Sequence, residues 1–110
     1  MLNLRAVESQ DLKVMQGWRN SDSVRPFVRE FRLLSEDDQM VWFDNYKRSR
    51  KDTEWGQELM LVQYDGIPIG VGGFVRIQWH NRRAELSFYI GEDNFREEYV
   101  IVETLHLLLY

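Results

Sequence analysis

The dipeptide Asp65-Gly66 restricts the fold more than any other feature, because it separates two stretches with the two-residue period of β-strands. Side chains alternate over two faces from Glu58 to Tyr64, and a second stretch of strand character runs from Ile67 to Trp79. A tight reversing turn needs positive φ, which glycine adopts at little energetic cost. The sequence therefore predicts an antiparallel hairpin in this part of the chain.

Three glycines interrupt the second of these strands, at Gly70, Gly72 and Gly73. Glycine inside a strand indicates a bulge, a bend or another backbone that passes close by. His80-Asn81-Arg82 predicts a further turn, after which alternation from Arg83 to Ile90 predicts a third strand. The middle of the chain is expected to form three successive antiparallel strands.

Two helices are expected before this meander, after a short strand from Leu2 to Ala6. The first helix runs from about Leu12 to Arg19, and Asp11 offers an N-cap for it. The second begins at the capping-box pattern Ser35-Glu36-Asp37-Asp38 and extends to about Arg50. Its apolar face, which needs the sheet as a partner, consists of Met40, Phe43 and Tyr46 with Trp42 beside them.

A last helix is expected from about Arg96 to the end of the chain, after the break at Gly91-Glu92-Asp93-Asn94. The elements then follow in the order β-α-α-β-β-β-α, which predicts a single α+β domain over residues 1–110 with helices layered on the sheet. The strand Arg83–Ile90 would form an exposed edge, which a second copy of the chain or a partner protein could cover.

Composition argues against several classes of function. The net charge of -4 gives no general attraction to nucleic acid or to anionic lipid, so neither is an expected partner. The chain has no Cys and only two His, far apart, so no disulfide, thiolate nucleophile or metal site is expected. No stretch approaches the roughly 20 apolar residues of a membrane span, and the N-terminus lacks the apolar core of a signal peptide. A cytoplasmic protein is therefore expected.

Four stretches of sequence together point to a known family. They are Leu4–Ala6 with Asp11-Leu12, Gly17–Asn20 with Val24-Arg25, Ser35-Glu36 with Trp42-Phe43, and Gly66–Gly70 through Asn81–Leu86. In these stretches the chain resembles the GNAT superfamily of N-acetyltransferases, nearest to its ribosomal-protein-alanine acetyltransferase type. The resemblance implies a mixed, mainly antiparallel sheet flanked by helices and truncated after the helix that follows the cofactor loop. It also implies transfer of an acetyl group from acetyl-CoA to a primary amine of a protein N-terminus or a small molecule.

The resemblance assigns acetyl-CoA binding to the last strand and to the helix after it. On the strand, backbone groups of Phe88, Tyr89 and Ile90 beside a bulge would hold the cofactor. After the strand, amides around the pyrophosphate would come from Arg96, Glu97, Glu98, Tyr99, Val100 and Ile101. A helix N-terminus suits phosphate in general, because it presents unpaired N–H groups and partial positive charge.

The family's loop pattern, Arg-Gly-x-Gly-x-Gly or Ala, is matched at Arg96, and none of its glycines is present. Glu97 and Glu98 would repel a pyrophosphate. Either these carboxylates only complement the first helical turn, or cofactor binding has been weakened or abandoned. The family's next strand, which forms the other wall of the acetyl-CoA gap, and a late Tyr acid would lie beyond residue 110.

Glu85 is the candidate general base, since the family often carries an acidic residue there that faces the cleft. The residues alone also allow a plain alternative, an exposed strand carboxylate paired with Arg83 or Arg76. By resemblance the segment after the first helix helps to form the acceptor pocket, with Arg29, Glu30 and Phe31 as contacts. The competing hypothesis is a catalytically inactive GNAT-like module that serves protein interaction or assembly.

Overall fold

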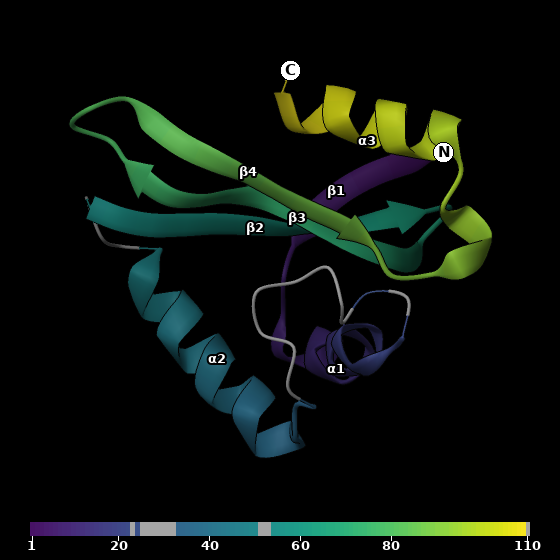
Figure 1. Cartoon of the computed structure of the whole chain (residues 1–110), viewed down its shortest axis with the longest axis horizontal. Helices are drawn as coiled ribbons and strands as arrows, with labels where there is room; N and C mark the ends of the chain where they lie inside the picture. The colour runs from purple at the N-terminus through teal and green to yellow at the C-terminus, as the bar shows by residue number, and fades with distance from the viewer. Residues whose placement is uncertain (23, 25–32, 51–53, 110) are drawn as a thin grey trace.

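The computed structural model describes residues 1–22, 24, 33–50 and 54–109. They form an antiparallel sheet in the order β1-β2-β3-β4, with β1 at Leu2–Ala6, β2 at Glu54–Tyr64, β3 at Ile67–Gln78 and β4 at Arg83–Ile90. Helices α1 (Leu12–Asn20) and α2 (Glu36–Ser49) lie on one face and α3 (Glu98–Leu109) on the other (Figure 1). The predicted α+β fold class and order of elements are confirmed.

The β2–β3 hairpin forms where the sequence predicts it. Asp65 and Gly66 have φ values of 50° and 84°, and the flanking Tyr64 and Ile67 face each other across the strands. Two successive positive φ values are what a type I′ turn requires. Strand β2 starts at Glu54 rather than at Glu58, because its first residues pair with the end of β3.

The glycines of β3 mark both a bulge and close approaches of other backbone. Ile69 is an extra residue, since Val62 of β2 lies opposite Gly70 whereas the next β2 residue lies opposite Pro68. A Cβ atom on Gly70 would lie 2.3 Å from the carbonyl oxygen of Tyr89. A Cβ atom on Gly73 would lie 2.1 Å from the carbonyl oxygen of Glu58. Both predicted roles of these glycines are confirmed.

Replacing Gly70 with Ala is expected to destabilise the domain by about 2 kcal/mol, because the added methyl would meet backbone that cannot turn away. Gly17→Ala is the matched control. Gly17 lies inside α1 with no atom within 4 Å of an added Cβ, so this change should stabilise by about 0.5–1 kcal/mol. Urea denaturation of both variants measures the two changes. Equal effects would show that the close approach at Gly70 has no energetic weight.

Helix α2 is capped as predicted and buries the predicted Phe43 and Tyr46, but Gln39 takes the place of Met40. The Asp38 N–H donates to Ser35 Oγ and the Ser35 N–H donates to the Asp38 carboxylate, both at 3.0 Å. The buried residues are Gln39, Phe43 and Tyr46, while Met40 is 59% exposed. The prediction for Met40 is wrong, because steps of four and three residues from position 39 select the side of the helix that meets the sheet.

Asp11 precedes α1, but its side chain does not cap that helix. Its carboxylate accepts a hydrogen bond from the Glu8 N–H at 2.8 Å and closes a short 3-10 turn at Ser9–Asp11. The same carboxylate forms an ion pair with Arg5 of β1. Asp11 is thus the N-cap residue of α1 by position, as predicted, but its side chain does not cap the helix, because a nearby cation and an earlier amide engage both oxygens.

Helix α3 begins at Glu98, two residues later than predicted. A 3-10 turn at Asp93–Phe95 precedes it, and Arg96 has a non-helical backbone.

Two cores hold the layers together. The core under α1 and α2 consists of Val7, Met15, Trp18, Phe43, Tyr46, Leu59, Leu61 and Val71. The core under α3 consists of Leu2, Val62, Ile69, Ile90 and Val100.

Helices in the described part of the chain are all too short or too polar to pass through a lipid bilayer.

Candidate functional site

Strand β4 ends the sheet on one side, and its outer edge carries backbone groups that β3 does not use. The Gly91 N–H donates to the Ile69 carbonyl at 2.7 Å, in the register that places Ile90 opposite Gly70. Bonded and non-bonded pairs alternate along an antiparallel ladder. The N–H and C=O groups of Leu86, Phe88 and Ile90 therefore point away from β3. Such an edge is a template for an extended ligand or another strand.

The pairing of β4 with β3 is regular at this edge. Register runs without interruption from Glu85 opposite Val75 to Ile90 opposite Gly70. The bulge that the resemblance implied beside Phe88 is thus absent from this pairing, and that expectation is wrong. Extra residues lie on β3 in both of its pairings instead, and one more lies on β2 between Glu54 and Gly56.

The side chains of the three predicted β4 contacts belong to the two cores. Phe88 and Ile90 pack on the α3 side of the sheet. Tyr89 faces α1, where its ring meets Trp18 edge to face with 6.3 Å between centroids. Burial raises the pKa of the Tyr89 phenol to about 12. Phe88 and Ile90 therefore offer a ligand only their outward backbone groups, whereas the backbone groups of Tyr89 are turned to β3.

Arg96 is engaged by the turn that contains it. Its guanidinium donates to the Ile90 carbonyl from Nε at 3.0 Å and from Nη2 at 2.7 Å. Nη1 pairs with the Asp93 carboxylate. These contacts fix the path from β4 into α3, and they occupy one of the outward carbonyls at the end of the strand.

The first turn of α3 offers amides together with negative charge. Ile101 donates its N–H to the Glu97 carbonyl at 3.1 Å, and the preceding amides have no partner one turn back within the helix. Glu97, Glu98 and Tyr99 are exposed, whereas Val100 is fully buried. The helix end thus has the donors that a phosphate needs, but two carboxylates stand beside them and no glycine opens a path.

Glu85 lies on β4 five residues before Ile90, about 16 Å away at roughly 3.3 Å per residue. Its carboxylate lies 3.8 Å from the Arg76 guanidinium, one of the two arginine partners expected for it. Strand alternation places it on the same face as Tyr89. The acceptor contacts predicted at Arg29, Glu30 and Phe31 lie outside the described residues.

The arrangement of the elements agrees with the family comparison. The sequence model of the acetyltransferase (GNAT) domain family matches residues 1–109. The chain belongs to this GNAT family. No match is found among curated proteins.

Solved structures share the GNAT fold at low sequence identity. A chimera of the spermidine N-acetyltransferase from Vibrio cholerae and hSSAT has a TM-score of 0.71 at 17% identity, with 96% of this chain and 58% of that one covered. The spermidine N-acetyltransferase from Vibrio cholerae, solved with CoA and spermine, has a TM-score of 0.73 at 19% identity, with 96% of this chain and 62% of that one covered. The ribosomal-protein-alanine N-acetyltransferase from Brucella melitensis has a TM-score of 0.62 at 18% identity, with 94% of this chain and 65% of that one covered. The chain therefore spans about three fifths of the length of these structures.

The Trp18-Arg19-Asn20 element, which contributed to the GNAT resemblance, connects three parts of the domain. Trp18 Nε1 donates to the Glu92 carboxylate at 2.8 Å, and its ring fills the space where a Cβ on Gly91 would lie. Asn20 accepts from the Leu34 N–H at 2.7 Å and donates to the Leu34 carbonyl at 2.8 Å. These contacts were not predicted from the sequence, although Gly91 at the end of β4 was a signal for close packing.

Proposed function

We propose that this chain binds acetyl-CoA along the outer edge of β4 and at the start of α3, as part of an N-acetyltransferase acting on primary amines. One observation carries the proposal: the outward backbone groups of Leu86 and Phe88 lead along one strand to the unpaired amides of a helix N-terminus. An extended arm ending in a pyrophosphate needs that sequence of donors. Membership of the GNAT family supports the same assignment.

Acetyl-CoA would supply the acetyl group as a thioester, and the chain would supply positioning and proton transfer. Amides at Glu98 and Tyr99 would hold the phosphates, and outward groups of Phe88 the arm. Glu85 would accept the proton of the attacking amine. Its carboxylate is on the face of β4 turned to α1, about 16 Å back along the strand from Ile90. The spermine found with the Vibrio cholerae enzyme favours small-molecule amines alongside protein N-termini as the acceptor class.

The inactive module is the second candidate, and the first turn of α3 favours it. Glu97 and Glu98 place two negative charges where the phosphates would lie, and Arg96 is held by Ile90 and Asp93. At an effective dielectric of about 20, one close pair of like charges costs about 4 kcal/mol, and in bulk water about 1. In this alternative the open edge of β4 would receive a strand of a partner protein.

A titration with acetyl-CoA separates the two candidates. We expect weak binding to the unmodified chain and at least tenfold tighter binding to the double variant Glu97→Gln, Glu98→Gln, because two repulsive charges are removed. Glu103→Gln is the control, since it makes the same change on the same helix about 7 Å farther along the axis. Calorimetry measures the affinities. Absence of heat and of any thermal shift at millimolar acetyl-CoA, in both the chain and the double variant, would favour the inactive module.

A further inference from the structure

The end of the sheet beyond α3 contains a pocket of about 750 Å³. Figure 1 shows that the β3–β4 turn and the adjoining strand ends extend past the last turn of α3, so no described helix covers this end on that side. The pocket contains none of the residues assigned above to acetyl transfer. It is therefore a separate feature of the surface.

The floor of the pocket is apolar. It is formed by Met60 of β2, Phe74 of β3 and Ala84 of β4. Two large apolar side chains lie exposed at its margin, Trp79 at 65% and Leu86, which faces Phe74 across the strands, at 43%. Exposed apolar side chains clustered around a pocket are typical of a binding site.

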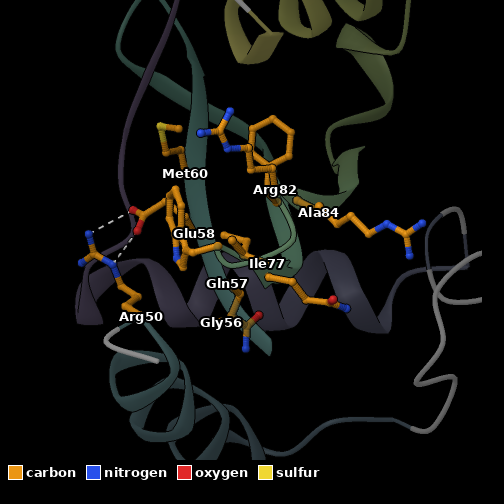
Figure 2. A pocket seen from close by; sticks show the side chains of 12 residues that line it. Arg50, Gly56, Gln57, Glu58, Met60, Ile77, Arg82 and Ala84 are labelled. Atoms are coloured by element: carbon orange, nitrogen blue, oxygen red, sulfur yellow. Dashed lines mark hydrogen bonds and ion pairs between the residues drawn. The ribbon is translucent and has the colours of Figure 1, made fainter. Parts of the chain in front are cut away.

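The rim of the pocket is positively charged. Arg50 donates to both carboxylate oxygens of Glu58 at 3.0 Å, so these two charges cancel at one flank (Figure 2). Arg82 and Arg83 also line the pocket, and neither forms an ion pair with a carboxylate in the parts of the chain that the structure describes. The rim therefore carries an excess of two positive charges, in a chain whose net charge is -4.

We propose that this pocket binds a small amphipathic carboxylate. Its chain or ring would lie over Met60 and Phe74, and its carboxylate would be held by Arg82, with the positive charge of Arg83 beside it. Guanidinium groups match the two oxygens of a carboxylate, and apolar surface beside them removes the ligand's body from water. The volume falls within the roughly 300–1,000 Å³ of small-molecule sites.

Decanoate is the probe for this site, and decanol is its uncharged counterpart. Calorimetry and protein-observed NMR, below the micelle concentration of decanoate and the solubility limit of decanol, are expected to show saturable binding of decanoate at least tenfold tighter than that of decanol. The double variant Arg82→Asn, Arg83→Gln should lose this preference and leave decanol binding unchanged. Asn is chosen at position 82 because the backbone there has φ of 53°, which Asn tolerates. Arg48→Gln, on α2 and outside the pocket, removes one positive charge as a control.

Several results would overturn the proposal. Equal affinity of the unmodified chain for decanoate and decanol, or decanoate binding that the double variant does not weaken, would remove the role of the arginines. Resonance shifts confined to residues outside the pocket would show that decanoate binds elsewhere on the chain. Ala84→Trp fills the hollow and should abolish binding of both probes. A concentration-dependent dimer in sedimentation that Ala84→Trp disrupts, and that excludes decanoate, would show that a second copy covers this surface instead.

Discussion

Replacing Asp11 with Ala is expected to destabilise the domain by about 3 kcal/mol, measured by urea denaturation at neutral pH. The Asp11 side chain is buried, and its two oxygens accept from Arg5 Nη1 and Nη2 at 2.7 Å each. The Glu8 N–H adds a third hydrogen bond at 2.8 Å. Removal of the carboxylate leaves a guanidinium without its partner and opens the turn that joins β1 to α1.

The exposed pair of Arg50 and Glu58 provides the control for Asp11. It also has two hydrogen bonds, from Arg50 Nε and Nη2 at 3.0 Å each, but both side chains are more than a third exposed to solvent. Glu58→Gln should therefore cost less than about 1 kcal/mol. If the two substitutions cost the same, burial of the Asp11 carboxylate does not decide the strength of the pair.

The stability contributed by Asp11 should also depend on pH. Burial by itself would raise the pKa of the carboxyl, but the hydrogen bonds from Arg5 and from the Glu8 N–H outweigh it, so the pKa lies below the ordinary value of 3.8. A group whose pKa is lower in the folded state stabilises above its unfolded pKa and loses this effect as the pH falls through the folded value. The difference in unfolding free energy between the unmodified chain and Asp11→Ala should be constant at neutral pH and shrink below about pH 4.

Replacing Tyr46 with Phe is expected to cost about 2–3 kcal/mol of stability. The Tyr46 hydroxyl accepts from the Leu59 N–H at 2.9 Å and donates to the Leu59 carbonyl at 3.0 Å. Pairing of β1 with β2 ends at Ala6 opposite Met60, so this hydroxyl takes the place of the next strand residue. Phe would leave both backbone groups buried without partners.

Tyr99→Phe is the control for Tyr46, because it removes the same hydroxyl from an exposed side chain on α3. It should change the unfolding free energy by less than about 0.5 kcal/mol. Hydrogen exchange gives a second readout at the site itself. The Leu59 amide should exchange slowly in the unmodified chain and lose this protection in Tyr46→Phe. An unprotected Leu59 amide in the unmodified chain would contradict the role given to the hydroxyl.

The candidate site shows where sequence reasoning stopped. The positions of β4 and of the helix after it were predicted from alternation and from helical spacing, and with them the open edge and the helix end. The engagement of Arg96 with the Ile90 carbonyl was not predicted, because it depends on the angle at which the chain turns after β4. The role of Glu85 as a base stays a prediction. The pocket next to Arg82 was not predicted, since its lining comes from three strands and the end of α2.

The sequence by itself determined the elements and their order. Turn residues, capping boxes and periodicity act over a few neighbouring residues, so Asp65-Gly66 and Ser35–Asp38 have the same meaning in any fold. Only the tertiary structure decided which partner each polar side chain takes and which side of a helix is buried. Asp11 bonds Arg5 rather than α1, and Gln39 is buried in place of Met40. The physical reason is that hydrogen bonds and packing act over a few ångströms in space, between residues whose separation along the chain carries no information about that distance.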